Sequence, residues 1–479
     1  MKELIKAAII FNVFVVGAPI AGVVIKNRPA WQRAAFGLML FLTIGGLMGP
    51  VEFGLTLQSV EWYRGHAKGF YFYLICAIGI TLTVARCLEK PVGLKFLSLG
   101  LVLYTLHVFL CAVSIKNAPM PGYTLMAFHK SLIFIWVFMG AYCFFQKEDD
   151  YAFLIRVMSL VMVWEMFVML KLRYLDGMYQ VRGTFEHQNP LAMFSIMIGM
   201  IFLSTAIGPP FRGRNVALLG YGACGVTVLF TLSRAAMAIF GAGSIAIIGF
   251  STLWKPTGRK LGVAASLFLG GSLVVVAALD TIVARFNQKG NKESGETREI
   301  MKDMCRAMNS DYPLGIGWNN YVHVANPPFR YCEIWWDYER SRGMRVDEER
   351  QIGAVESHYY LLLAENGWLG LGSYLLVIVY FLLVNIRSFF AHPDSLARWF
   401  SFGIAAGCSM NYVQSTLERV LTQPRNLGLW MIILASGSKL FCLRNDPGFR
   451  PDDGSKGIDA SKRALKNPDG NRKKPKGRK

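Results

Sequence analysis

Three short polar segments contain residues that could act on an anionic substrate, and each lies beside a long apolar run. The first reads Val-Arg-Gly-Thr-Phe-Glu-His-Gln-Asn-Pro-Leu-Ala from 181 to 192. It holds four candidate ligand-binding residues: Arg182, Glu186, His187 and Asn189. A helix N-terminus beside an arginine can bind an anion, so this turn is a candidate phosphate site. An interfacial turn with Asn189 as N-cap and Pro190 in the first helical position is the alternative.

The other two segments add further ionisable residues. Thr-Leu-Ser-Arg, at 231–234, places Arg234 between two apolar runs with almost no loop. A guanidinium there must pair, line a wet cavity or snorkel to the interface. The third segment, 297–370, contains Arg298, His358 and Glu365. His358 and Glu365 are two helical turns apart and share one helix face. A histidine that faces a cavity near arginines is a candidate general base, which the glutamate would orient.

The elements that carry these segments are predicted membrane helices. The chain has 479 residues, of which 53% are hydrophobic and only 17% are charged. A run of about 20 apolar residues crosses a bilayer as a helix. We predict an all-α, polytopic membrane protein with about 12–13 transmembrane helices, ten in residues 1–280 and three in 358–443. The predicted spans are 4–25, 34–51, 70–85, 96–115, 131–145, 153–172, 190–207, 216–232, 235–254, 261–280, 359–384, 400–416 and 427–443.

The distribution of Lys and Arg predicts the orientation of these spans. Residues 444–479 are basic and rich in Pro, Gly and Asp, so we expect a disordered cytoplasmic tail. Counting back along the chain, four basic loops are also cytoplasmic: Lys26–Arg33, Arg86–Lys95, Arg212–Arg214 and Lys255–Lys260. The N-terminus then lies outside, and its apolar run is expected to be a retained span because no convincing cleavage site follows.

The formal net charge of +20 indicates contact with anionic membrane lipid. No nucleic-acid motif accompanies the charge, so nucleic acid is not an expected partner. Nine cysteines fit no metal spacing. A site built from His187, His323 and His358 lacks both the spacing and the carboxylate partners of a metal centre. We therefore expect neither a metal nor another cofactor.

One loop, 281–357, is much longer than the others and is predicted to lie outside the membrane as a partly helical lid. Its aromatic residues Trp335, Trp336 and Tyr338 are expected to dock on lipid or sugar, since each offers an apolar ring with a polar edge. The same loop contains two cysteines. Cys305 and Cys332 would lie in an oxidising compartment, as a disulfide or as two free thiols.

Taken together, the polar segments resemble the O-antigen ligase and O-antigen polymerase family. The resemblance rests on Arg-Gly-Thr-Phe-x-His-x-Asn-Pro-Leu-Ala, Leu-Ser-Arg, Thr-Arg-Glu, Pro-Leu-Gly-Ile-Gly and Ser-His-x-x-Leu-x-x-x-Glu-x-Gly-x-x-Gly, in that order. It extends from about Arg182 to about Gly370, and the first third of the chain adds only its hydropathy. Tyr359 follows His358 where family members often have Asn, which weakens inference about the type of acceptor.

The resemblance implies a metal-independent, inverting glycosyltransferase at the periplasmic face of the bacterial inner membrane. Such proteins move a glycan from undecaprenyl diphosphate to a hydroxyl of lipid A core, of another glycan or of a protein. Arg182 and Arg234 would stabilise the leaving diphosphate, and His358 would be the base. The substrate-binding residues would be Glu186, His187, Asn189, Arg298 and Glu365. Ligases and polymerases share these motifs.

The alternative is a polytopic transporter or a flippase of lipid-linked glycans. Such folds often consist of paired halves with broken helices near the midplane. The sequence has no half-to-half symmetry, and its unusual polar residues gather at one predicted interface. This arrangement favours the enzyme.

The predicted orientation can be tested with reporter fusions. Fusions at Asn291 and Ser341 should report the periplasm, and a fusion after Arg450 should report the cytoplasm. The reason is that loops rich in Lys and Arg stay on the cytoplasmic side of the membrane. A cytoplasmic signal from the 281–357 loop would contradict the orientation and the sidedness of every candidate site residue.

Overall fold

Helices form nearly all of the regular structure in the computed structural model, which describes residues 1–44, 53–89, 98–277, 279, 283, 291–446 and 449. The first half contains α1 (Lys2–Ile10), a π-helical stretch (Phe11–Gly17), α2 (Ala18–Ile25), α3 (Pro29–Phe41), α4 (Leu74–Glu89), α5 (Leu99–Ala112), α6 (Pro121–Ile133), α7 (Ile135–Phe144), α8 (Glu148–Tyr174) and α9 (Gln188–Ile207). The second half contains α10 (Arg214–Phe230), α11 (Arg234–Trp254), α12 (Gly258–Ala277), α14 (Asn291–Asp311), α15 (Tyr321–Val324), α16 (Cys332–Ser341), α17 (His358–Ala391), α18 (Leu396–Gln414) and α19 (Pro424–Leu443).

Eight helical stretches within the described residues are long and apolar enough to cross a membrane. They are Lys2–Ile25, Leu99–Asn117, Pro121–Phe144, Glu148–Tyr174, Gln188–Ile207, Arg234–Trp254, His358–Ala391 and Pro424–Leu443. Five other helices, α3, α4, α10, α12 and α18, fall in the remaining predicted spans. The predicted all-α, multi-pass membrane protein is therefore confirmed. Residues 45–51 of one predicted span lie outside the described residues, as does nearly all of the predicted tail.

Two predicted spans begin differently in the structure. Span 70–85 opens with a strand, β2 (Phe70–Tyr73), which pairs antiparallel with β1 (Gly54–Leu57). The four aromatic residues of β2 favour a strand, and α4 follows directly after it. Span 131–145 is longer than predicted, because α6 already begins at Pro121 with proline in its first turn.

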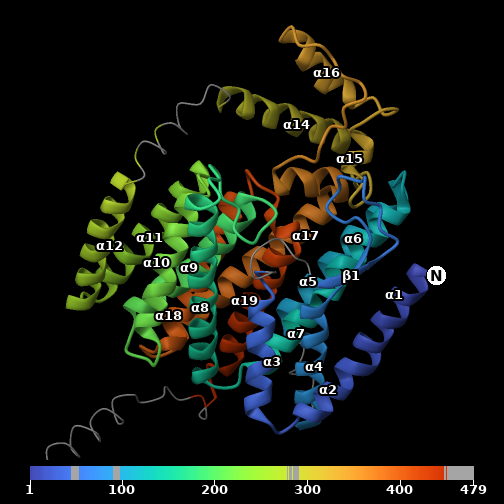
Figure 1. Cartoon of the computed structure of the whole chain (residues 1–479). Helices are drawn as coiled ribbons and strands as arrows, with labels where there is room; N and C mark the ends of the chain where they lie inside the picture. Colours follow the sequence, from blue (N-terminus) through green and yellow to red (C-terminus); the bar gives the residue numbers. More distant parts are fainter. Residues whose placement is uncertain are drawn as a thin grey trace, which may run out of the picture.

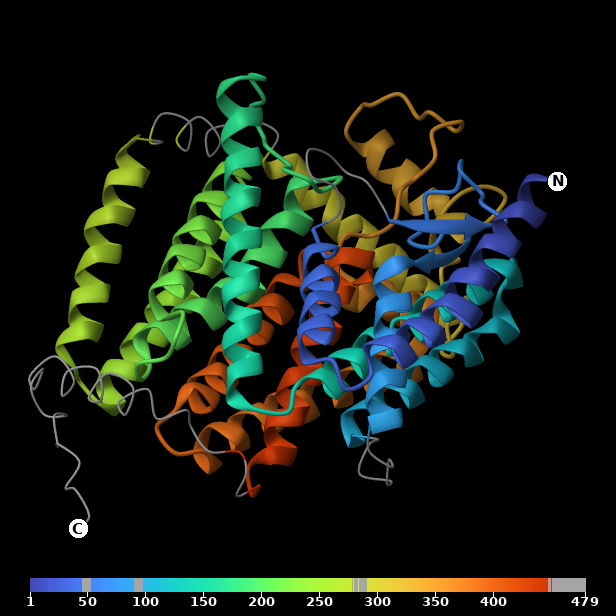
Figure 2. The same cartoon turned by 60° about the horizontal axis from the view of Figure 1, so that its bottom comes forward.

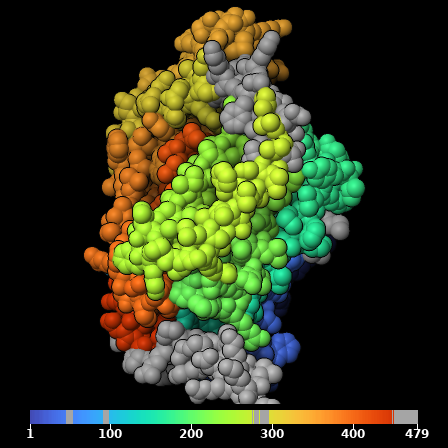
Figure 3. All heavy atoms as spheres, turned by 90° about the vertical axis from the view of Figure 1, so that its left-hand side faces the viewer, coloured from blue at the N-terminus to red at the C-terminus, as the bar shows by residue number. Residues whose placement is uncertain are grey.

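Helix α9 lies at the centre of the bundle (Figures 1 and 2). Its membrane-spanning window is completely buried, with neighbours α8, α10, α11 and α18 on its sides. A helix that is apolar all round needs such an enclosed position. At the bundle's edge, α12 instead presents Phe268, Leu269 and Leu273 on its outer surface. Figure 3 shows this helix running across the exposed face, where lipid is the natural neighbour.

The described parts of the basic loops share one end of the bundle. There Arg33 pairs with Asp149 at 2.5 Å, and Lys255 pairs with Asp394 at 3.2 Å. Helix α19 ends at this same end, and α14 to α16 lie at the opposite one (Figure 1). This arrangement is the one that the charge distribution predicts, although the sidedness itself stays a prediction.

The described part of the long loop contains three helices, α14, α15 and α16, and packs against itself. Tyr338 donates to Glu296 on α14 at 3.2 Å, and the Trp335 indole N–H donates to Glu339 at 2.9 Å. The Tyr338–Glu296 bond joins α16 to α14 at the outer edge of the molecule (Figure 1), whereas the Trp335–Glu339 bond lies within α16. Docking on lipid or sugar therefore stays a prediction. Cys305 and Cys332 are both buried free thiols, so of the two alternatives for these cysteines the structure has the unbonded one.

Helix α17 is broken where the loop returns to the bundle. Gly367 has φ 61° and ψ −163°, a backbone conformation that is nearly exclusive to glycine. The break frees backbone groups that pair with the Pro-Leu-Gly-Ile-Gly segment. Ile316 N–H donates to Ala364 O at 3.0 Å, and Trp368 N–H donates to Pro313 O at 3.2 Å. The two glycine-containing motifs thus form one backbone joint.

Gly367→Ala should destabilise this joint. A Cβ at Gly367 would lie 2.1 Å from the Pro313 carbonyl oxygen, and the conformation itself costs about 1–3 kcal/mol for other residues. Thermal unfolding of the purified protein should show the loss. Gly372→Ala on the same helix is the matched control, because nothing lies within 4 Å of a Cβ there. Equal stability of the two variants would contradict the assigned role of Gly367.

Candidate functional site

A cavity of about 420 Å³ lies at the outer end of the bundle, where four segments meet. We call it the arginine cavity. Its lining residues are Gln180, Gln188, Asn189, Leu232, Ser233, Arg234, Ala235, Arg298, Leu417 and Glu418. Three of the residues predicted from sequence, Asn189, Arg234 and Arg298, therefore share one site although 109 residues separate the first from the last.

Arg234 reaches the cavity because α10 and α11 are joined by a tight turn. Only three residues separate Phe230 from Arg234, and Leu232 within the turn has φ 52°. The Val181 N–H donates to the Phe230 carbonyl oxygen at 3.3 Å, which brings the Arg182 segment to the same turn. Arg182 itself is exposed, does not line the cavity, and donates to the Glu186 carbonyl oxygen at 3.4 Å.

A buried carboxylate fixes the Arg-Gly-Thr motif. Glu165 on α8 accepts from the Thr184 N–H at 2.8 Å and from the Thr184 hydroxyl at 2.9 Å. Gly183 has φ 56°, and a Cβ there would lie 1.8 Å from the Glu165 carboxylate. Arg425 at the start of α19 donates to the Thr184 carbonyl oxygen. The motif is therefore constrained by this carboxylate, and sequence reasoning missed both Glu165 and Arg425.

The start of α9 differs from the predicted interfacial turn. His187, not Asn189, occupies the N-cap position, and its Nδ1 accepts from the Asn189 N–H at 3.3 Å. Asn189 belongs to the first helical turn, and its side-chain amide donates to Glu418 at 2.6 Å. The prediction of Asn189 as N-cap is thus wrong. Its side chain lines the cavity instead, whereas Glu186 and His187 are exposed and do not line it.

Two carboxylates meet Arg298 at the cavity. The Arg298 guanidinium forms an ion pair with Glu356 and a second one, at 3.4 Å, with Glu418. The Glu418 side chain is 14% exposed. Burial, together with the nearby Glu356 charge, raises the pKa of Glu418 to about 7. The sequence analysis did not identify Glu418, because nothing in the chain order links it to Arg298.

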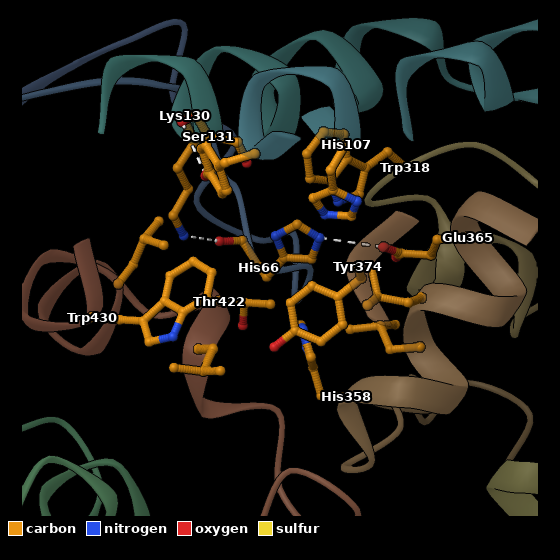
Figure 4. Close-up of a pocket in the computed structure, with 15 residues that line it drawn as sticks. His66, His107, Lys130, Ser131, Trp318, His358, Glu365, Tyr374, Thr422 and Trp430 are labelled. Atoms are coloured by element: carbon orange, nitrogen blue, oxygen red, sulfur yellow. Dashed lines mark hydrogen bonds and ion pairs between the residues drawn. The ribbon is translucent and has the colours of Figure 1, made fainter. Parts of the chain in front are cut away.

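His358 and Glu365 line a different and smaller space, which we call the histidine pocket (Figure 4). Its volume is about 60 Å³, and the labelled side chains around it are His66, His107, Lys130, Ser131, Trp318, His358, Glu365, Tyr374, Thr422 and Trp430. Lys130 donates to the His66 carbonyl oxygen at 2.7 Å. The His358 ring is 5% exposed, packs at 5.0 Å on Tyr374, and has no hydrogen-bond partner at Nδ1 within the described chain.

The helical spacing suggested that Glu365 orients His358, but in the structure its carboxylate has other partners. Its carboxylate contacts the His66 Nε2 at 3.3 Å and accepts from the Tyr321 N–H at 3.1 Å. Burial lowers the pKa of His66, although the Glu365 carboxylate acts in the opposite direction. The carboxylate therefore connects two segments to α17: the turn between β1 and β2, which carries His66, and the long loop, which carries Tyr321.

One short stretch separates the two spaces. We call Ser415–Thr422, between α18 and α19, the dividing segment. Its Leu417 and Glu418 line the arginine cavity, and its Leu421 and Thr422 line the histidine pocket. The His358 N–H donates to the Ser415 carbonyl oxygen at 3.0 Å. The structure thus brings Arg234, Arg298 and Asn189 together but leaves His358 on the other side of this segment.

A metal site finds no support in the described residues, where no group of three or more His, Cys, Asp and Glu side chains could hold an ion. His187 lies at the α9 N-terminus, and His323 lies on α15 against Tyr123 and Phe329. Sequence reasoning also passed over His107 and Lys130. The available signal was an ionisable residue inside or beside an apolar run, which in membrane proteins often indicates function.

Comparison with known families gives one match. Residues 219–375 match the family described as O-Antigen ligase. The matched region contains Arg234, Arg298, His358 and Glu365, whereas the 181–192 segment and Glu418 lie outside it. No curated protein matches the chain significantly.

Proposed function

We propose that the chain transfers a glycan from undecaprenyl diphosphate to an acceptor hydroxyl, because residues 219–375 match the O-antigen ligase family within a multi-pass membrane protein. Proteins of this family are glycosyltransferase-like ligases and polymerases. The proposed reaction takes place at the periplasmic face of the bacterial inner membrane. The acceptor is lipid A core, a growing polysaccharide or a protein.

The arginine cavity carries the proposal. Helices α9 and α11 both begin at its wall, where Gln188 and Arg234 are the first helical residues. Helix N-termini attract anions through their free N–H groups and their dipoles, and Arg234 and Arg298 add two guanidiniums. Guanidiniums bind phosphate oxygens in a bidentate manner. A volume of about 420 Å³ is within the usual range for ligand sites. These features support binding of a diphosphate with part of its sugar.

The reaction follows from where charge develops. The bond between the anomeric carbon and the diphosphate oxygen breaks, and a new bond to the acceptor oxygen forms with inversion. Negative charge then grows on the departing lipid diphosphate, where Arg234 and Arg298 would stabilise it. Arg182, on the neighbouring exposed turn, would contact the same group as it enters. No metal is needed for this step, since the guanidiniums carry the positive charge.

His358 is the proposed acceptor of the hydroxyl proton. Its Nδ1 has no hydrogen-bond partner within the described residues, and a histidine side chain placed beside a hydroxyl can serve as a general base. Its position across the dividing segment adds a requirement. The acceptor hydroxyl would have to reach His358 through the histidine pocket, or Ser415–Thr422 would have to move when substrates bind.

The orientation supports a periplasmic site. The arginine cavity lies at the end of the bundle opposite to the basic loops, which the positive-inside rule assigns to the cytoplasm. Lipid-linked glycans completed on that outer face would approach from the membrane plane.

Arg234→Lys and Arg298→Lys should each reduce glycan transfer by about 10- to 100-fold. Lysine keeps the charge but loses the planar fork, and a hydrogen bond to a charged group contributes about 1.5–3 kcal/mol. Transfer from a polyprenyl-diphosphate glycan in purified membranes would measure this, normalised to protein abundance. Arg306→Lys on the same helix as Arg298 is the control, because Arg306 is exposed and pairs with Asp303. Normal transfer by both cavity variants would contradict the proposed donor site.

His358→Ala should reduce the rate per molecule by about 10²–10⁴, the range typical for loss of a general base. The variant should still bind the lipid-linked donor, since His358 does not line the arginine cavity. Donor binding and single-turnover transfer, measured on the same preparation, separate these effects. Near-normal transfer per molecule would end the general-base proposal without affecting the donor site.

A further inference from the structure

Glu418 is an unusual residue to find in a cavity suited to anions. Its carboxylate accepts from the Asn189 amide at 2.6 Å and from the Arg298 guanidinium at 3.4 Å. These are two of the polar groups that a diphosphate in the cavity would need. In the structure, the carboxylate therefore occupies the place of an anionic ligand.

Other charged groups face Glu418 from the surrounding elements. Arg298 on α14 and Arg234 at the start of α11 lie on the cavity wall. Glu356, just before α17, repels Glu418, whereas Arg419, its chain neighbour, attracts it. His187, at the α9 N-cap, is the nearest histidine along that helix. Partial burial lowers the pKa of His187, whereas the Glu356 charge acts in the opposite direction.

We propose that Glu418 is a positioning residue that holds Arg298 and Asn189 toward the arginine cavity and takes up a proton when the lipid diphosphate enters. This inference rests on the proposed function. It adds to donor binding the uptake of one proton by Glu418. The proton comes from solvent and is bound by the carboxylate, and no covalent bond changes.

The physical reason is a competition between two anions for the same donors. An entering diphosphate takes the Arg298 N–H groups, so the carboxylate loses its partner and is left beside phosphate charge. In a half-buried site such repulsion favours the neutral acid. A protonated carboxyl can then donate a hydrogen bond to a phosphate oxygen instead of repelling it. Protonation thus removes the conflict between Glu418 and the donor.

The direction of the pH dependence follows from linkage. The pKa of Glu418 is about 7 in the structure, and the added phosphate charge would raise it further. Below about pH 6 the acid is already protonated, so donor affinity is constant there. As the pH rises through 7, binding must also draw a proton from solution, and affinity falls by up to about tenfold per pH unit. The fall stops above the pKa of the bound state.

Binding of a short diphosphate diester to the full-length protein tests this directly. Farnesyl methyl diphosphate is a suitable probe, because both of its phosphates are ionised throughout the range from pH 6 to 9. Calorimetry at pH 8 in two buffers of different ionisation enthalpy should show uptake of most of one proton per probe bound. Affinity should fall about fivefold between pH 7 and 8, and more steeply above pH 8. These measurements on the unaltered protein need no variant.

Glu418→Gln keeps the size and one acceptor oxygen but cannot ionise. Its affinity for the probe should be constant from pH 6 to 9, and binding should take up no proton. Glu356→Gln is the matched control, because Glu356 pairs with the same guanidinium from a more exposed position. That variant should still take up a proton on binding, but its fall in affinity should begin at a lower pH, because the Glu356 charge helps to raise the pKa of Glu418.

The possible results separate this proposal from the proposed function. Tight binding without proton uptake, or uptake that persists in Glu418→Gln, would overturn the role of Glu418 and leave the donor site standing. If the unaltered protein does not bind the probe, or if Arg298→Lys leaves probe binding unchanged, the donor site and this coupling are both overturned. Loss of both proton uptake and pH dependence in Glu418→Gln alone is the result we expect.

Discussion

The backbone joint between the outer loop and α17 is the contact on which the candidate site depends. Because Gly367 breaks the helix, Ala364 and Glu365 offer free carbonyl groups to Ile316 and Gly317. The joint fixes the Glu365 carboxylate, which in turn holds the Tyr321 N–H and His66. It also fixes where α14 returns to the bundle, and with it Arg298. Non-helical backbone of this kind is tolerated near a membrane only where it is buried in protein or lines a wet cavity.

The same principle governs the charged residues. Three ionisable groups near the outer end illustrate it. Glu165 accepts from the Thr184 N–H, Arg425 donates to the Thr184 carbonyl oxygen, and Arg298 pairs with two carboxylates. Such pairing is expected, since an isolated charge in an apolar bundle is costly. A substrate with its own negative charge can enter only by exchanging partners within this network. Binding of an anion in the arginine cavity therefore requires that existing ion pairs break as new ones form.

The spans and the order of the motifs could be predicted from the sequence, because hydropathy and short-range spacing are local properties. Residues 131–145 and 70–85 show the limit, since a proline start and a run of aromatics moved the helix boundaries. Contacts between residues far apart in the sequence could not be predicted. His358 and Glu365 do share a helix, but the carboxylate is used by His66, almost 300 residues earlier in the chain. Glu418 was missed for the same reason, because only the fold places it against Asn189 and Arg298.

The dividing segment gives the two spaces a physical connection. Arg419 lies within it and interacts electrostatically with Glu365 at the histidine pocket and with Glu356 and Glu418 at the arginine cavity. A change of charge in the cavity, such as the arrival of a diphosphate, alters what this arginine is attracted to. The segment also holds the His358 N–H through Ser415. A single short stretch of chain therefore forms a wall of both spaces, and its one arginine interacts with the carboxylates of both.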